Sequence, residues 1–158
     1  MSFEEIYHDY YQRIFRVCMG YVNDHDWAQD LTQETLIAVW QKLSQFRNEA
    51  AVGTWIFRIA SNNCLRQIER TKRMPRTEMP FQLEDRQEPA LEGQVGLLYK
   101  YISGLPELDR IIISLELEDV KQAEIATIVG LTESHLRVRI HRIKDKLYKK
   151  FKSDGPQF

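Results

Sequence analysis

The sequence contains no long apolar run and no basic segment at its start. No apolar stretch among its 158 residues approaches the roughly 20 residues that a membrane-spanning helix needs. The first five residues, MSFEE, are acidic, whereas a signal peptide begins with a basic segment. These absences predict a cytoplasmic protein. An apolar fraction of 43% is ordinary for a globular chain that buries a core.

Cysteine is scarce, and the sequence lacks the motifs of common catalytic sites. Cys18 and Cys64 each stand among apolar neighbours at helical spacing, which predicts free buried thiols rather than a disulfide or a metal site. The histidines do not have a metal-ligand spacing with cysteine. There is no P-loop, dinucleotide-binding loop or nucleophile motif. We therefore predict no catalytic residue, no metal, no cofactor and no enzymatic activity of the chain's own.

The chain also lacks an excess of charge of either sign, since its formal net charge is −1. The charges are nevertheless segregated. Residues 53–76 carry six Lys or Arg against one Asp or Glu, and residues 121–158 carry nine against four. Residues 1–52 and 77–120 are acidic, with four against eight and three against ten. Two basic blocks could each bind a polyanion, although solvated helix faces would give the same charge pattern.

Apolar residues recur at the helical positions i, i+3, i+4 and i+7 in the first half of the chain. They predict helices over residues 3–22, about 27–46 and 52–60, the first with a capping box formed by Ser2 and Glu5. Residues 61–63, Ser-Asn-Asn, are poor helix formers and predict a break or short loop. A basic run at helical spacing follows this break.

The helical pattern lapses after residue 73 and then resumes. Residues 74–92 contain three prolines among charged residues and no sustained apolar period, which predicts a linker. Beyond it the pattern predicts a helix that stops near Gly104, a helix with Pro106 in its first turn, a short helix over Gln122–Val129, a turn at Gly130 and a helix from Thr132 to about Phe151. Every predicted element is helical.

The last two predicted helices have the spacing of a helix-turn-helix. Ala126 lies four residues before Gly130, and Leu136 lies six residues after it. A small residue permits close crossing of the two helices, glycine permits the left-handed turn conformation, and a branched apolar residue anchors the second helix. Thr132 is a suitable N-cap for that helix.

The outward face of the last helix predicts contact with a DNA major groove. Its apolar stripe consists of Leu136, Ile140, Ile143 and Leu147, and the opposite face carries Ser134, Arg137, Val138, His141 and Arg142. Arginine suits bidentate contact with guanine, and the flanking Lys144, Lys146, Lys149 and Lys150 suit phosphates. An ordinary helical hairpin with a solvated basic face is the alternative, which the combined spacing, cap and charge make less probable.

Two features of the first basic block and its surroundings favour a second interface. Asp30, Gln33, Glu34, Ile37 and Gln41 form one mainly polar stripe, although a solvated face would have the same composition. Aromatic residues and an amide-rich segment lead directly into the basic run. Bases drawn out of a duplex need aromatic faces, polar edges and cations. The alternative, that Trp55 and Phe57 are core aromatics, is expected to hold for at least one of them.

Taken in order, these motifs resemble regions two and four of extracytoplasmic-function sigma factors of the sigma-70 family. The first block matches through Asp30-Leu31-x-Gln33-Glu34, Trp40, Phe46-Arg47 and Thr54-Trp55-Ile56-x-Arg58-Ile59-Ala60-x-Asn62. The second matches through Leu105-Pro106-x-x-x-Arg110, Glu124-Ile125-Ala126, Gly130-Leu131-Thr132 and Arg137-x-Arg139-Ile140-x-Arg142. The ordered set is specific, although each motif alone is weak.

The resemblance implies an all-α protein with two small helical domains on a flexible linker. Residues 1–74 would form the region 2 helical bundle, 75–92 the linker, 93–152 the region 4 helix-turn-helix and 153–158 a tail. The protein would bind core RNA polymerase and direct transcription initiation at promoters, usually under the control of an anti-sigma factor.

The resemblance also implies a role for each group of residues. Asp30, Gln33 and Glu34 would bind the clamp coiled coil of the largest polymerase subunit. The minus-ten element would be contacted by Trp55, Arg58, Ser61, Asn62, Asn63, Arg66 and Arg70, with Asn62 reading a flipped base. The minus-thirty-five element would be contacted by Ser134, Arg137, His141, Arg142 and Lys144.

Two other functions are compatible with parts of the pattern. A transcriptional regulator could use only the C-terminal helix-turn-helix, with the N-terminal helices as an interaction domain. It would bind duplex DNA without polymerase. A hydrolase or nuclease would need clustered carboxylates or histidines, which the sequence does not offer.

Overall fold

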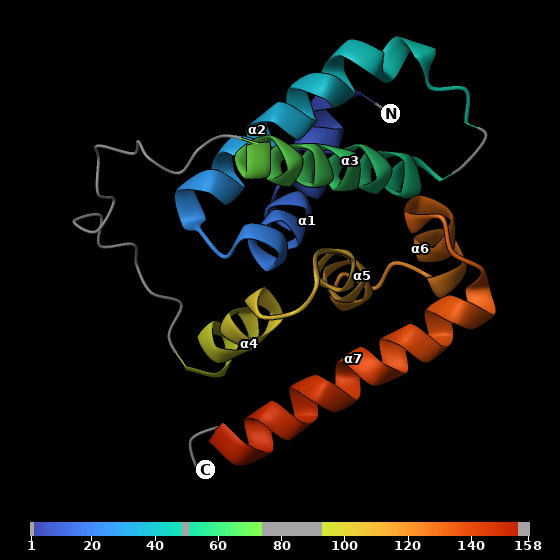
Figure 1. Cartoon of the computed structure of the whole chain (residues 1–158). Helices are drawn as coiled ribbons and strands as arrows, with labels where there is room; N and C mark the ends of the chain where they lie inside the picture. Colours follow the sequence, from blue (N-terminus) through green and yellow to red (C-terminus); the bar gives the residue numbers. More distant parts are fainter. Residues whose placement is uncertain (1, 49–50, 74–92, 155–158) are drawn as a thin grey trace.

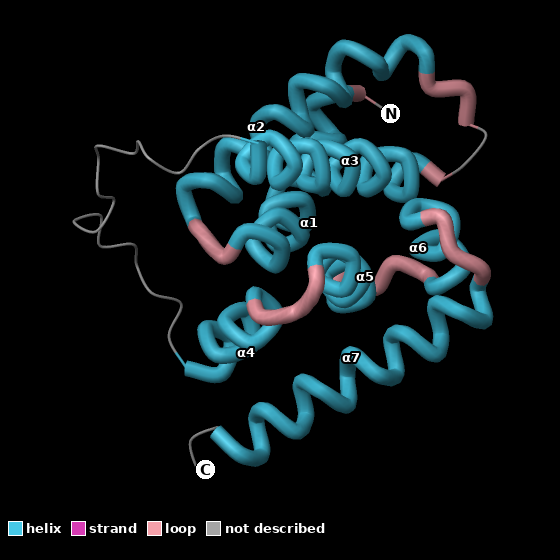
Figure 2. The backbone as a smooth tube through the Cα atoms, in the orientation of Figure 1, coloured by secondary structure: helices cyan, strands magenta, loops and turns pink. Residues whose placement is uncertain are grey.

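The computed structural model describes residues 2–48, 51–73 and 93–154 (Figure 1). Within these ranges the chain is helical, as expected, and has no strand (Figure 2). The elements are α1 (Phe3–Val22), α2 (His25–Lys42), a short 3-10 turn (Leu43–Gln45), α3 (Val52–Arg73), α4 (Gly93–Ser103), α5 (Glu107–Leu117), α6 (Gln122–Val129) and α7 (Glu133–Asp154). The predicted linker lies outside the described residues.

The ends of the first helices are fixed by local side chains, and the cap at Ser2 is the one that the sequence predicts. Ser2 caps α1 because its Oγ accepts a hydrogen bond from the backbone N–H of Glu5 at 3.2 Å. Asn23 ends α1 in the left-handed conformation. Asp24 then caps α2 by accepting from the N–H of Trp27 at 2.9 Å. Two residues, Asn23 and Asp24, are therefore enough to connect α1 to α2.

The break predicted at residues 61–63 is wrong, because α3 continues through it to Arg73. Ser61 and Asn63 are buried. The Asn63 amide donates to the hydroxyl of Thr35 on α2 at 3.3 Å and accepts from the guanidinium of Arg66. The preference of these residues for local backbone hydrogen bonds is therefore outweighed by packing and by partners on α2 and α3.

The C-terminal helices form the predicted helix-turn-helix. Gly130 has φ 79°, the left-handed conformation that the turn requires. Ala126 and Leu136 are buried on either side of it. The Thr132 hydroxyl accepts from the backbone N–H of His135 at 3.2 Å and so caps α7. Pro106 is the N-cap of α5 rather than a residue of its first turn, a difference of one position.

Both cysteines are free and buried, which confirms the prediction for them. Cys18 on α1 and Cys64 on α3 lie with their sulfur atoms 3.8 Å apart. Hydrogen bonding to Cys18, together with burial, raises the pKa of Cys64 well above its ordinary value. A protonated, inaccessible thiol is a poor nucleophile, so the pair acts as small apolar residues between the two helices.

The N-terminal module (α1–α3) and the C-terminal module (α4–α7) pack against each other, an arrangement that the sequence does not determine. In Figure 1, α5 lies directly beneath α1 and α3, with α7 along the far side. The closest approach is between Gly20 on α1 and Ser114 on α5, where an added Cβ on Gly20 would lie 2.0 Å from the Ser114 hydroxyl oxygen. One apolar core therefore extends through both modules.

A buried carboxylate joins the two modules electrostatically. The Glu118 side chain, just beyond α5, accepts from Arg16 Nε at 2.7 Å and from its Nη2 at 3.0 Å. Arg13 donates to the Glu118 carbonyl oxygen at 2.6 Å. The hydrogen bond with Glu118 raises the pKa of Arg16 above its ordinary value. On the other side of the interface, Arg110 donates to the carbonyl oxygen of Tyr21 at 3.0 Å.

Candidate nucleic-acid interface

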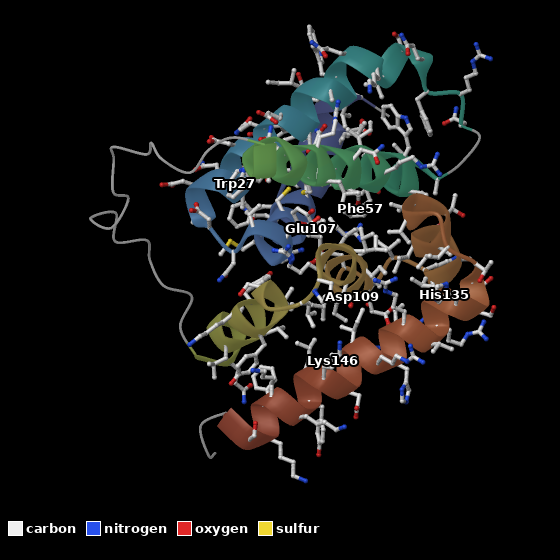
Figure 3. The ribbon with its side chains drawn as sticks, viewed as in Figure 1. Trp27, Phe57, Glu107, Asp109, His135 and Lys146 are labelled. Atoms are coloured by element: carbon white, nitrogen blue, oxygen red, sulfur yellow. The ribbon has the colours of Figure 1, made fainter. Side chains whose placement is uncertain are left out.

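The first half of α7 presents a polar and basic face to solvent. Its core-facing residues, Leu136, Ile140, Ile143 and Leu147, are buried against the other helices of the module. Side chains on the opposite face are exposed: Ser134, Arg137, Val138, His141 and Arg142. Figure 3 shows this helix along the outer edge of the molecule, with His135 near its start and Lys146 further along. The predicted outward face is therefore on the surface.

Not every cation of α7 belongs to that face. Arg139 points toward the core and donates to the Asp109 carboxylate on α5 at 2.5 Å. Lys144, predicted to contact DNA, pairs instead with Glu116 at 2.9 Å. Two arginines, Arg137 and Arg142, remain on the outward face, and Arg137 lies 3.9 Å from the Glu133 carboxylate one turn earlier.

The other predicted phosphate-binding lysines lie toward the C-terminal end of α7. Lys146, Lys149 and Lys150 line a hollow of about 770 Å³ between α7 and α4. Its remaining wall is partly apolar and includes Tyr101 and Leu105. Lys149 also pairs with Asp145 one turn earlier, at 3.0 Å. These lysines therefore form a surface distinct from the start of α7.

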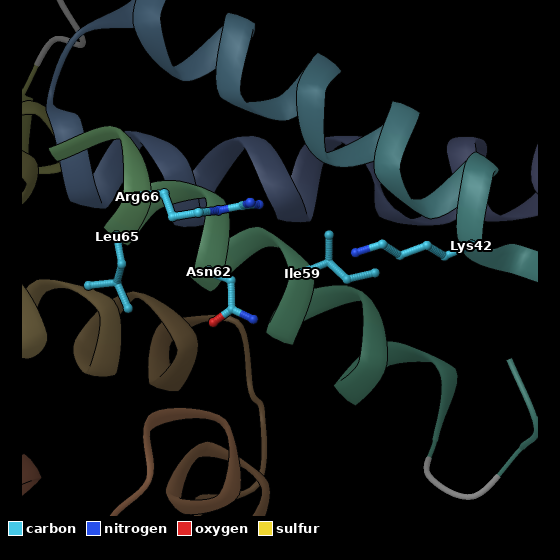
Figure 4. A pocket seen from close by; sticks show the side chains of 5 residues that line it. All are labelled: Lys42, Ile59, Asn62, Leu65 and Arg66. Carbon is cyan, nitrogen blue, oxygen red and sulfur yellow. The ribbon is translucent and has the colours of Figure 1, made fainter. Parts of the chain in front are cut away.

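Residues of α2 and α3 line a second hollow, of about 380 Å³ (Figure 4). Its lining consists of Lys42, Ile59, Asn62, Leu65 and Arg66. Figure 4 shows Lys42 reaching from α2 toward Ile59, while the other four residues come from α3. An amide, two cations and two apolar side chains thus surround one opening. They offer a polar edge, positive charge and apolar contact for a displaced base, but the lining has no aromatic side chain.

The amide segment predicted to read bases is divided between surface and interior. Asn62 is exposed, whereas its neighbours Ser61 and Asn63 are buried, because successive helical residues point in different directions. Asn63 lies behind the surface, where it connects Thr35 to Arg66. Arg70 lies on α3, but its side chain is outside the described residues.

The two aromatic residues before this segment also differ. Phe57 is a core residue packed edge to face on Tyr10, with ring centroids 6.0 Å apart. Trp55 is half-buried and stacks on Phe46 at 4.9 Å. The expectation that at least one of Trp55 and Phe57 belongs to the core is confirmed by Phe57. Arg58, between them and Asn62, is exposed.

The polar stripe of α2 is exposed and has an apolar extension. Asp30, Gln33 and Glu34 all face solvent, and Glu34 accepts from the Gln67 amide of α3 at 3.2 Å. Ile37 and Trp40 continue the stripe with 54% and 63% exposure. In the sequence, Trp40 is one of the residues that match region two, and no surface was predicted for it. Its spacing of three from Ile37 was the available signal that it shares the exposed stripe.

The described residues contain no group of three or more histidine, cysteine or acidic side chains arranged to hold a metal ion. Among the same residues, no helix is long and apolar enough to cross a membrane. The candidate binding surfaces are thus the stripe of α2, the hollow on α3 and the outward face of α7.

Comparison with known families identifies the two modules. Residues 6–74 match the model for Sigma-70 region 2, and residues 96–147 match that for Sigma-70 region 4. The chain belongs to the sigma-70 family, in its extracytoplasmic-function (ECF) group. The resemblance found in the sequence is confirmed, and so is the function it implied: a sigma factor directs transcription initiation at promoters.

Similar curated sigma factors align over most of their length. The RNA polymerase sigma-H factor of Pseudomonas aeruginosa is 27% identical, with 94% of this chain and 85% of the relative covered. The sigma factor YlaC of Bacillus subtilis is 25% identical, with 94% and 91% covered. The ECF sigma factor SigM of Mycobacterium tuberculosis is 23% identical, with 92% and 75% covered.

Solved sigma-factor structures share the fold. One is the sigma factor RpoE of Bartonella quintana in complex with the anti-sigma factor NepR, with TM-score 0.78, 21% identity and coverage of 96% of this chain and 98% of that one. Another is CnrH in complex with the cytosolic domain of CnrY, with TM-score 0.70, 19% identity and coverage of 96% and 88%. At this identity the likeness concerns the arrangement of the helices.

Proposed function

We propose that this ECF sigma factor reads the minus-thirty-five element with the outward face of α7. The observation that carries the proposal is the exposure of Arg137, His141 and Arg142 on the side of α7 away from a buried apolar stripe. A recognition helix enters the major groove with its N-terminal residues toward the base edges. Arg137 and Arg142 then contact guanines, and Ser134 and His141 supply further hydrogen bonds. Lys144 contributes a phosphate contact only when it leaves Glu116.

The test of this assignment compares two cations of α7. Arg142→Ala should weaken binding of promoter duplex by about 5-fold or more, because a bidentate arginine–guanine contact is worth about 1–3 kcal/mol. Lys152→Ala, ten residues further along the exposed side of α7, is the matched control and should change affinity much less. Binding is measured with the full chain loaded on core polymerase. Equal loss in the two variants would mean that α7 binds DNA through charge alone.

We infer that the hollow on α3 takes a base flipped out of the minus-ten element. The exposure of Asn62 and the presence of Lys42 and Arg66 at the same opening support this role. Trp55, Arg58 and Arg70 would hold the separated strands. Ser61 and Asn63 act indirectly, because they are buried and Asn63 orients Arg66. Asn62→Ala should therefore reduce promoter opening, as reported by permanganate reactivity of unpaired thymines, more than it reduces duplex binding.

We further infer that the stripe of α2 binds core polymerase on the clamp coiled coil of its largest subunit. Asp30, Gln33 and Glu34 provide the polar and charged contacts. Ile37 and Trp40 provide an apolar centre of the kind that dominates binding energy in interfaces. The chain acts as a non-catalytic subunit in the cytoplasm, where polymerase and promoters are found.

Charge reversal on α2 tests the polymerase contact. Glu34→Lys should weaken binding to core polymerase by tenfold or more, whereas Asp9→Lys, an equally drastic change at an exposed site of α1, should have little effect. Fluorescence titration of core polymerase with the labelled chain gives both affinities. If Glu34→Lys binds core normally, the assignment of the stripe fails. If the unaltered chain binds duplex DNA but not core, it acts as a regulator that uses the helix-turn-helix alone.

Control by an anti-sigma factor is the last part of the proposal. One similar solved structure contains a sigma factor bound to an anti-sigma factor, and it shares this chain's helical arrangement. A partner of that class would cover one or more of the three exposed surfaces. Competition between such a partner and core polymerase for the purified chain would test it.

A further inference from the structure

Val138 is an exposed apolar side chain at the centre of an otherwise polar and basic face. It is the sixth residue of α7 and is 50% exposed. Ser134 and Arg142 lie four residues before and after it, and His141 lies three residues after it, so these side chains surround Val138 on the helix surface. At 100° per residue, Val138 points almost directly away from the buried stripe of Leu136, Ile140 and Ile143.

Neither packing nor helix formation explains a valine at this position. A side chain directed away from the core contributes little to burial. Valine is also a poorer helix former than the straight-chain residues that usually occupy exposed positions, because branching at Cβ restricts its side chain in a helix. A lone exposed apolar residue needs no explanation by itself. The position of Val138 does need one, because the proposed DNA contacts on α7 surround it on the helix surface.

We propose that Val138 is a base-specificity residue that packs against the C5-methyl group of a thymine in the minus-thirty-five element. The inference rests on the proposed function of α7 and identifies one of the bases it selects. The thymine methyl is the apolar group that the major groove offers at an A·T pair, and apolar side chains are its usual contact. Valine has no donor or acceptor, so it discriminates against cytosine, which lacks the methyl group and presents an amino group instead.

Replacement of thymine by deoxyuridine tests this contact, because it removes the methyl group and leaves every hydrogen-bonding group unchanged. The preferred minus-thirty-five sequence is first selected from a randomised duplex by the full chain on core polymerase. Each thymine is then replaced singly. At one position, or two adjacent ones, we expect about a fourfold loss of affinity, which corresponds to about 0.8 kcal/mol at 1.4 kcal/mol per tenfold.

Two variants make the result specific to Val138. In Val138→Ala the deoxyuridine penalty at that position should fall well below fourfold, because the shorter side chain makes less contact with the methyl group, while discrimination at the guanines contacted by arginine persists. Tyr148→Ala, at another exposed non-polar position of α7, should keep the full deoxyuridine penalty. Alanine is the stronger helix former, so Val138→Ala should fold normally, and circular dichroism checks that it does.

The possible failures have different meanings. If selection enriches no minus-thirty-five sequence, the proposed function of α7 is overturned. If a sequence is enriched but every thymine tolerates deoxyuridine, or the full penalty survives in Val138→Ala, the proposal for Val138 is overturned and sequence reading by α7 stands.

Discussion

Asp109 and Arg139 form the ion pair that fixes α7 against α5. The carboxylate is buried, and the Arg139 guanidinium is mostly covered, with 30% of its side chain exposed. Arg139 lies two residues from Arg137 in a run of alternating arginines, yet the two have different surroundings. Arg139 is held inside the module and sets the orientation of α7, whereas Arg137 faces solvent.

Removing the Asp109 carboxylate, the buried partner of Arg139, should destabilise the chain. We expect Asp109→Ala to lower the free energy of unfolding by about 1–3 kcal/mol, because it leaves Arg139 partly buried without its carboxylate. Asp145→Ala breaks an exposed pair with Lys149 and should cost less than about 0.5 kcal/mol. Urea denaturation of both variants gives the comparison. Equal losses of stability in the two variants would show that the pair between Asp109 and Arg139 contributes no more than a surface ion pair.

The outward residues of α7 could be predicted from the sequence, but the partners of its cations could not. Periodicity places Arg137, His141 and Arg142 opposite the apolar stripe without any tertiary information. Arg139 and Lys144 lie on the flanks of the helix, where either solvent or a neighbouring helix can face them. Their partners, Asp109 and Glu116, are 30 and 28 residues away in the chain and come close only through packing.

At the scale of elements, the turn between α6 and α7 depends on one backbone conformation. Gly130 has positive φ and no atom within 4 Å of the place where a Cβ would be. The cost of a side chain there is therefore conformational and not steric.

Gly130→Ala should lower stability by about 1 kcal/mol, because alanine adopts the left-handed conformation at that cost. Gly104→Ala is the matched control in another interhelical turn, where φ is not positive, and should be nearly neutral. Thermal unfolding of the two variants measures the difference. A neutral Gly130→Ala would indicate that the turn relaxes to another conformation.

Helix positions followed from the sequence because the apolar residues repeat regularly, and two of the ends followed from Ser2 and Gly130. The false break at residues 61–63 shows where this method fails. Serine and asparagine side chains favour local hydrogen bonds, but here α2 offers Thr35 as a partner 28 residues away. For the same reason, the sequence could not separate exposed Asn62 from its buried neighbours.

At the scale of the whole molecule, the docking of the two modules could not be predicted from periodicity. It depends on the close approach of α1 and α5, where Gly20 leaves room for Ser114. The Ser114 hydroxyl is buried and has no hydrogen-bond partner within the described part of the chain. Shape, rather than polar bonding, therefore determines this crossing.

Gly20→Ala should destabilise the chain by about 1–3 kcal/mol through overpacking at this crossing. In a Ser114→Ala background the cost should fall, because the oxygen 2.0 Å from the added Cβ is gone and only the Ser114 Cβ, at 3.1 Å, remains close. A double-mutant cycle from urea denaturation measures this coupling. Strictly additive changes in the free energy of unfolding would show that Gly20 and Ser114 do not interact.

Glu118 should control how tightly the modules stay together. Glu118→Gln removes the buried charge that pairs with Arg13 and Arg16, so the radius of gyration from small-angle X-ray scattering should increase. For a compact chain of this length the expected value is about 15 Å. Asp145→Asn, on the exposed side of α7, should leave the scattering unchanged. An unchanged profile for Glu118→Gln would mean that the shared apolar core is sufficient for docking.

The docked arrangement limits how much DNA the molecule can reach. Elements centred near positions −10 and −35 are about 25 base pairs apart, or about 85 Å along the duplex. A compact chain of this size is only about 40 Å across. Simultaneous contact with both elements therefore requires the modules to separate, and the observed promoter affinity equals the intrinsic affinity multiplied by the open fraction. A chain that is open about 1% of the time would bind about a hundredfold more weakly than a permanently open one. The contacts of Glu118 and Gly20 therefore set the open fraction. Polymerase raises this fraction if it binds the separated modules, and an inhibitor lowers it if it binds the docked modules.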